Sequence, residues 1–261
     1  MIRVLIIAQI VWRETIRRKD LYVLFILLLS FLLVLMTLNI FGLRSMTGYI
    51  KETGLLMAWI FAWILAVGGG ARQLPQEERN GTIFPLLAKP VKRSELIIGK
   101  WLGVWGVTGA ATACFYIILA VIVAARAGRF SPVLMLEAWM LHFCFIGILS
   151  AFVILFSTRM NSDAAATAAA VLSVASFLFL PQIPHLAGIA SGWRREVLLV
   201  VYYALPHLEL FDLRQRVIHN WDPVGPASFL MIVLYGLLTA AVFILLAWLA
   251  YRRKKFSRDV I

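Results

Sequence analysis

The sequence predicts an all-α protein that spans a membrane six times. Of its 261 residues, 62% are hydrophobic and only 15% are charged. The mean hydropathy of +0.89 lies outside the range of soluble globular domains. Several uncharged runs also approach the length of about 20 residues that a helix needs to cross the hydrocarbon core. Composition and run length together indicate a helical membrane protein.

The predicted elements form one transmembrane domain that covers residues 1–261. Residues 1–20 place Leu5, Ala8, Trp12 and Ile16 on one helical face, away from the basic side chains. This pattern predicts an amphipathic helix that lies in the membrane interface. The apolar runs then predict six spans, at 21–41, 55–71, 101–125, 133–156, 164–184 and 227–251.

The segment 185–226, between the fifth and sixth predicted spans, is interrupted by glycine, arginine and proline. It predicts external amphipathic helices at the outer surface rather than a further span. Three histidines occur here beside acidic residues, but their spacing matches no metal-ligand signature, and no metal site is predicted. They are His185, His207 and His219.

The basic residues predict the orientation of the chain. Most of the 25 lysines and arginines fall in the N-terminal segment, the loop 72–100, the turn at Arg159 and the C-terminal tail. Positive charge favours the cytoplasmic side, so both termini and this loop are predicted inside, in a bacterial or archaeal cytoplasmic membrane. Contact with anionic headgroups also explains the net charge of +12, and nucleic acid is not a predicted partner.

The motifs of common enzymes are missing from the sequence. It contains no G-x-x-x-x-G-K-[ST] phosphate loop, no nucleophile elbow and no zinc-binding helix. Cys114 and Cys144 each fall near the middle of a predicted span, where a thiol behaves as a small hydrophobe. The chain is therefore not predicted to be an enzyme or to hold a cofactor.

The loop between the second and third predicted spans contains an apolar knob enclosed by charges. Asn80-Gly81 is a turn signal, and Thr82 can cap a short helix over 83–88. Ser94 then caps the long helix of the third span. An apolar patch rimmed by charge generally marks a contact site for another protein. The alternative is a loop helix that only braces the second and third spans.

The run "EERNGTIFPLLAKPVKRSELIIGKWLG", followed by the long third span, resembles the ABC-2 type permeases, the membrane half of type 2 ABC exporters. Within them it is most similar to the multicopper-enzyme and nitrous-oxide-reductase maturation branch. The resemblance implies that the loop 76–90 holds a coupling helix that seats on a separate ABC ATPase subunit, present in two copies. ATP and magnesium would be bound by that partner. The implied coupling contacts are Glu77, Glu78, Arg79, Gly81, Thr82 and Phe84.

The same resemblance implies a homodimer whose first and fifth spans line the interface and the translocation path. The small residues of "SDAAATAAAVLSVAS" support close helix packing by the fifth span. For each hydroxyl the alternative is a hydrogen bond to its own helix backbone. The candidates for the interface and the path are Thr37, Asn39, Ala164, Thr167, Ala168 and Ser173.

The predicted function is the permease subunit of an ABC exporter, which couples ATP hydrolysis by the partner to substrate movement. Membrane lipids are further expected partners. A second interpretation is a mechanotransmitter that passes force to an external accessory protein and transports nothing. A third interpretation is an intramembrane enzyme, but the sequence lacks a set of catalytic residues for one.

Overall fold

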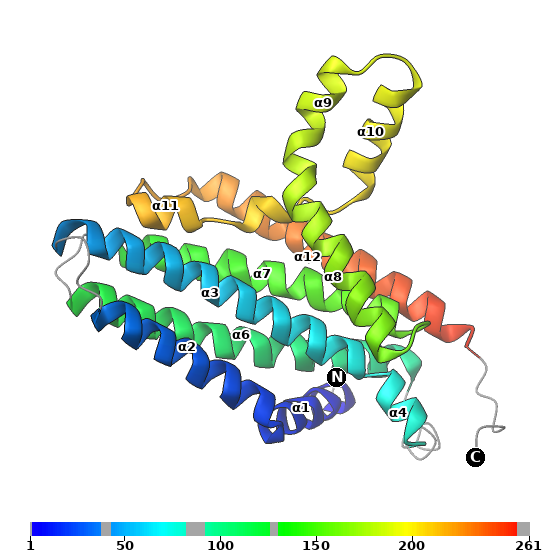
Figure 1. Cartoon of the computed structure of the whole chain (residues 1–261). Helices are drawn as coiled ribbons and strands as arrows, with labels where there is room; N and C mark the ends of the chain where they lie inside the picture. Colours follow the sequence, from blue (N-terminus) through cyan, green and yellow to red (C-terminus); the bar gives the residue numbers. More distant parts are fainter. Residues whose placement is uncertain (1, 38–42, 82–91, 126–129, 255–261) are drawn as a thin grey trace.

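The computed structural model describes residues 2–37, 43–81, 92–125 and 130–254. Within these ranges the chain is helical and contains no β-strand. Figure 1 shows α2 (Lys19–Thr37), α3 (Leu43–Arg72), α6 (Arg93–Ala125) and α7 (Pro132–Ser157) running side by side along one long axis. Near one end of this bundle lie α1 (Ile2–Arg17) and the short α4 (Pro75–Arg79).

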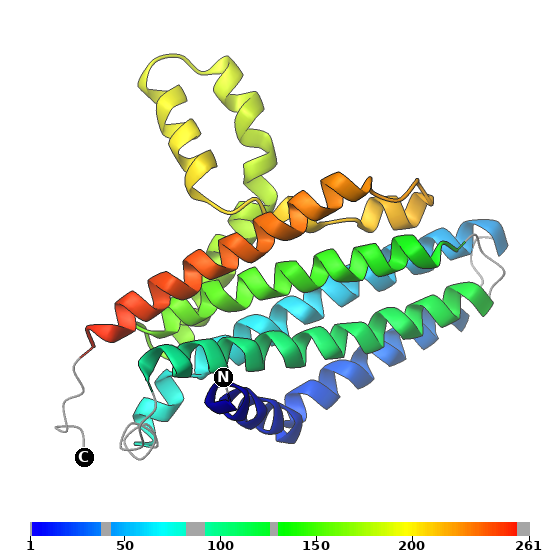
Figure 2. The same cartoon turned by 180° about the vertical axis from the view of Figure 1, so that it is seen from behind.

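The helix α7 is the centre of the bundle. Most of its side chains are buried, and it contacts α3, α6, α8 (Ser162–Phe179) and α12 (Pro226–Arg252). Figure 2 shows α12 packed along α7 from the other side. A helix that is apolar all round is expected in such a central position.

Among the residues that the structure describes, five helical segments are long and apolar enough to cross a membrane, which makes the chain a multi-pass membrane protein. The first predicted span, 21–41, lies only partly within the described residues: α2 is helical over Lys19–Thr37, and residues 38–41 lie outside them. The predicted count of six is therefore not confirmed. The five segments are Thr47–Arg79, Arg93–Ala125, Pro132–Ser157, Ser162–Ile189 and Pro226–Arg252.

Two helices extend well beyond the apolar runs at 55–71 and 101–125. α3 begins at Leu43 and α6 begins at Arg93. Each extension contains a lysine that precedes the apolar run in the sequence. Lys51 donates from Nζ to Asn220 Oδ1 at 2.7 Å, and Lys100 is paired with Glu77. Lysine is a good helix former, and both cations have partners elsewhere in the chain, so the helices continue through them.

A hairpin of two helices stands off the bundle between α8 and α12. α8 ends at a 3₁₀ turn, η1 (Leu180–Gln182), which contains Pro181, a residue that removes a backbone donor. α9 (Ile183–Ile189) and α10 (Trp193–Ala204) then project away from the long axis in both views (Figures 1 and 2). η2 (Leu208–Phe211) and α11 (Arg214–His219) return the chain to the bundle beside α3 and α7.

Candidate functional site: the α4 junction

The helix α4 forms the first part of the predicted coupling loop. Pro75 stands at the start of the helix, where its missing N–H costs no hydrogen bond. Leu74, completely buried, anchors the turn that connects α3 to α4. Gly81 ends the helix with a positive φ of 67°, a conformation that favours glycine. The local sequence therefore fixes a single short turn of helix directly after α3.

Three consecutive side chains of α4 bind cations from three different parts of the bundle. Gln76 Oε1 accepts from Arg18 Nη2 at 2.8 Å, at the junction of α1 and α2. Glu77 pairs with Lys100 of α6. Successive side chains of an α-helix point about 100° apart, so one turn can reach three neighbours. The third residue, Glu78, accepts from Lys254 Nζ at 2.7 Å, just after α12.

The pair between Glu77 and Lys100 is the most buried of these contacts. The Lys100 side chain is only 2% exposed, and that of Glu77 is 21% exposed. A buried ammonium group is strongly disfavoured unless a carboxylate neutralises it. Lys100 and Glu77 therefore hold α4 against α6.

Basic side chains from the same end of the bundle donate hydrogen bonds to the C-terminal end of α12. Arg159 Nη2 donates to the carbonyl oxygen of Ala250 at 3.0 Å. The last carbonyl groups of a helix have no partner within it, and cations also interact favourably with its dipole. Arg93 Nη1 lies within hydrogen-bonding distance of three further carbonyl oxygens, those of Tyr251 (3.0 Å), Arg252 (2.8 Å) and Lys254 (3.0 Å).

The other predicted coupling contacts divide into two groups. Arg79, the last residue of α4, is exposed, and Gly81 is partly exposed. Thr82 and Phe84 lie outside the described residues, as does the helix predicted over 83–88. Glu77 and Glu78 face lysines of the bundle.

The predicted interface residues of α8 also differ from one another. Ala164 and Thr167 are exposed, and Ala168 is partly exposed. Thr167 Oγ1 donates to the carbonyl oxygen of Asp163 at 2.9 Å, which is the backbone bond expected as the alternative role for a hydroxyl. Ser173 is buried and accepts from Trp63 Nε1 at 3.0 Å, so it joins α8 to α3 within one chain.

Two candidates for the path belong to the end of α2. Thr37 is the last residue of this helix, and Asn39 lies outside the described residues. The two are therefore left as predictions.

Sequence reasoning missed three partners of α4: Arg18, Lys100 and Lys254. Lys100 gave a signal, because a lone lysine near the start of an apolar span is costly and needs a partner. Arg18 and Lys254 lie in basic runs that the positive-inside rule already explains. The sequence pattern therefore does not predict their individual contacts.

At the end of the bundle opposite α4, α11 lies beside α3 and α7 (Figure 1). Arg214 forms an ion pair with Asp212 at 2.7 Å and lies 5.3 Å from the ring of Trp59. His142 is buried between that ring and Tyr116, whose hydroxyl lies 3.2 Å from Nδ1. Across the part of the chain that the structure describes, no three His, Cys, Asp or Glu side chains gather as a metal ion would require.

The long bundle, with a short helix tied to its end, can be compared with known families. The sequence pattern of the family described as "ABC-2 family transporter protein" matches residues 5–256. This chain belongs to the ABC-2 transporter family. A comparison with curated proteins found no match. The family match supports a membrane permease of an ABC transporter, and it does not separate the multicopper-enzyme branch from the others.

Proposed function

We propose that this ABC-2 chain is the permease subunit of an exporter driven by a separate ABC ATPase. Two copies of the permease and two of the ATPase would form the working complex, with both termini in the cytoplasm. ATP and magnesium would be bound by the ATPase. The observation that carries the proposal is the α4 junction, where one helical turn contacts three elements of the bundle.

The contacts of α4 suggest how a movement of the ATPase would spread. A displacement of α4 pulls on the junction of α1 and α2 through Arg18 and on α6 through Lys100. It also pulls on the end of α12 through Lys254, which donates as well to the carbonyl oxygen of Thr158 at 3.0 Å. These helices would then rock as a rigid body against a second copy, in the manner of hinge and shear transitions.

The proposed contact with the ATPase is divided between two kinds of residue. Glu77 and Glu78 transmit the movement inward, because their carboxylates face lysines of the bundle. Arg79, Gly81, Thr82 and Phe84 form the proposed outward contact. Apolar anchors near the centre of an interface usually dominate its energy, and rim charges adjust rate and specificity. Phe84 is the proposed anchor.

Co-purification of the ATPase with permease variants tests this proposal. Phe84→Ala should weaken retention of the ATPase by about 2 kcal/mol or more, and Arg79→Ala by less. Tyr203→Ala, a matched aromatic truncation on the distant α10, should retain the ATPase fully. Normal assembly and ATP hydrolysis with Phe84→Ala would leave the loop as a brace between α3 and α6. Coupled hydrolysis without substrate movement would favour the mechanotransmitter.

A further inference from the structure

The segment that connects the α9–α10 hairpin to α12 lies across three helices of the bundle. We call this segment, residues 207–225, the strap; it contains η2 and α11. η2 contacts α7 and α8, and α11 contacts α3 and α7 at the end away from α4 (Figure 1). The buried apolar side chains of the strap are Leu208, Phe211, Leu213 and Val217.

A cation–π contact joins the middle of the strap to the bundle. The guanidinium carbon of Arg214 lies 5.3 Å from the centre of the Trp59 ring and 5.9 Å from that of Phe177. Asp212 orients this guanidinium group, because its carboxylate oxygens accept from Arg214 Nε and Nη2 at 2.7 to 3.0 Å. The Trp59 ring stacks in turn on His142, with 4.4 Å between the ring centres. One side chain of the strap is thereby linked to α3, α7 and α8.

The end of the strap is held to α3 by a buried lysine. Lys51 Nζ donates to Asn220 Oδ1 at 2.7 Å and to the carbonyl oxygen of Val217 at 3.4 Å. Asn220 has a positive φ of 51°, an uncommon conformation for a residue other than glycine, which the surrounding contacts must maintain. Lys51 and Trp59 both belong to α3, so the position of α3 determines both contacts.

The start of the strap is anchored on α12 instead. A Cβ at Gly236 would meet Phe211 Cε1 at 2.9 Å, so the Phe211 ring packs directly on the backbone of α12. The hydroxyl of Tyr235, also on α12, accepts from the backbone N–H of His207 at 2.9 Å. These contacts do not involve α3, and a movement of α3 leaves them in place.

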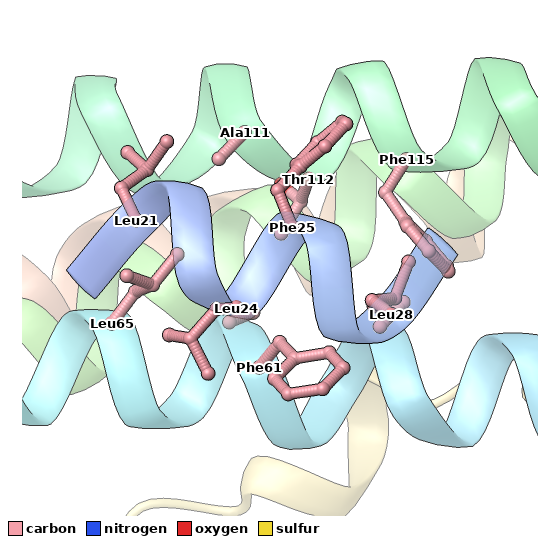
Figure 3. Close-up of a pocket in the computed structure, with 11 residues that line it drawn as sticks. Leu21, Leu24, Phe25, Leu28, Phe61, Leu65, Ala111, Thr112 and Phe115 are labelled. Carbon is pink, nitrogen blue, oxygen red and sulfur yellow. The ribbon is translucent and has the colours of Figure 1, made fainter. Parts of the chain in front are cut away.

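The side of α3 that faces α2 is apolar. Figure 3 shows side chains of α2, α3 and α6 around a hollow of about 30 Å³. Among the described residues that line it, Thr112 alone is polar, and its hydroxyl donates to the Gly109 carbonyl oxygen of its own helix at 2.8 Å. Apolar contacts are non-directional, and packed helices can slide past each other by small shear movements. A small shift of α3 along α2 therefore breaks no hydrogen bond in this hollow, but it displaces Lys51 and Trp59.

We propose that the strap is a releasable latch, in which Arg214 and Asn220 hold α3 in its resting position against α7 and α8. A shift of α3 separates Arg214 from the Trp59 ring and Asn220 from Lys51, while Phe211 stays on α12. The strap then moves with α12 rather than with α3. Only the cause of the shift rests on the proposed function, because α3 leads directly into α4 and so to the ATPase.

Maleimide labelling of the purified full chain in detergent measures release of the strap. The reporter is Val217→Cys, at a buried position of α11, in a background without Cys114 and Cys144. A second reporter, Ala151→Cys, lies at a completely buried position in the middle of α7. It should stay protected throughout, and it distinguishes release of the strap from general unfolding.

Arg214→Gln and Trp59→Leu should each increase the labelling rate of Val217→Cys by roughly fivefold or more, because each removes one side of the cation–π contact. Arg216→Gln is the matched control and should leave the rate unchanged. Arg216 Nη1 donates within the strap, to the carbonyl oxygen of Asp222 at 3.1 Å. Unchanged labelling in the Arg214 and Trp59 variants would overturn the latch, and so would an equal increase at Ala151→Cys.

The complex with the ATPase tests what releases the latch. Addition of ATP should increase the labelling of Val217→Cys by roughly threefold or more and leave Ala151→Cys protected. Continued ATP hydrolysis with no change at Val217→Cys would overturn release through α4. An ATPase that fails to bind would contradict the proposed function alone, since the Arg214 and Trp59 variants decide the latch without it.

Discussion

Lys100 shows how a single buried charge organises the end of the bundle that holds α4. Its side chain is almost fully enclosed at the start of an apolar helix, and its partner Glu77 comes from α4. The neighbouring pair between Lys254 and Glu78 is more open, with the side chains 24% and 23% exposed. The adjacent carboxylates of Glu77 and Glu78 therefore form ion pairs of different burial. Removing one carboxylate should destabilise the protein more than removing the other.

Glu77→Ala should destabilise the protein by about 3 kcal/mol, because it leaves the Lys100 ammonium buried and unpaired. Glu78→Ala is the matched control and should cost about 1 kcal/mol or less, since its partner can be hydrated. Thermal unfolding in detergent measures both. Replacing Glu77 by Leu together with Lys100 by Met should recover most of the lost stability. Equal losses for the two single variants would contradict this account of the α4 junction.

At the scale of the element, α1 packs against a row of glycines on α6. A Cβ at Gly99 would meet Ile7 at 2.7 Å, and one at Gly103 would meet Val11 at 2.5 Å. The buried face of α1 is therefore formed by Ile7 and Val11, and the predicted apolar stripe through Leu5 stays exposed. α1 has one apolar face for the bundle and a second that is available to lipid.

Gly103→Ala should push α1 away from α6 and cost about 1–3 kcal/mol, because the new methyl group overlaps a stiff β-branched side chain. Gly48→Ala is the control: its Cβ meets no atom within 4 Å, and it should be neutral or slightly stabilising. A cysteine in place of Ile7, in a background without Cys114 and Cys144, reports the displacement. It should resist a maleimide with Gly103 present and react in the alanine variant. Protection in both would mean that the contact adapts without moving α1.

At the scale of the whole molecule, the outer face of α8 is exposed. Ala164 and Thr167 are exposed on it, and Val171 extends the same face. Ala165 and Ala169 are completely buried within the chain and pack toward the bundle. The small residues of α8 therefore lie on two different faces of the helix. Only substitutions on the exposed face can test for a dimer interface.

Ala164→Leu should weaken self-association by about 1–3 kcal/mol if the outer face of α8 packs against its twin. Ala169→Leu should instead lower the thermal stability of the single chain, because its site is already filled. Chemical crosslinking and sedimentation in detergent distinguish the two effects. Unchanged self-association of Ala164→Leu would exclude this face from the interface.

The orientation of the bundle gives a further prediction at the same scale. In a background without Cys114 and Cys144, a cysteine at Ser94 should resist an impermeant thiol reagent in intact cells. A cysteine at Ser191, in the exposed turn between α9 and α10, should react. The charge distribution gives this direction, because lysines and arginines concentrate at the end that holds α4. The opposite pattern of labelling would remove the cytoplasmic ATPase from the proposal.

The sequence by itself determined the helical membrane class, the transporter family and the position of the polar loop. Apolar composition and charge asymmetry are local properties, and they persist whatever the packing. α7 ends at Ser157 and the side chain of Asn161 caps α8, both within a few residues of the ends of the predicted spans 133–156 and 164–184, because turn and cap residues act over a few positions.

Only the tertiary structure decided how far the helices extend and which charges meet. Lys51 and Lys100 precede apolar runs in the sequence, yet α3 and α6 continue through them, and Asn220 and Glu77 supply their partners. The partner of Lys51 lies 169 residues away along the chain, and a local sequence pattern does not predict contacts at that separation. The α4 junction has the same origin: short-range chemistry forms the helical turn, and the long-range pairing of buried charges determines which parts of the bundle it connects.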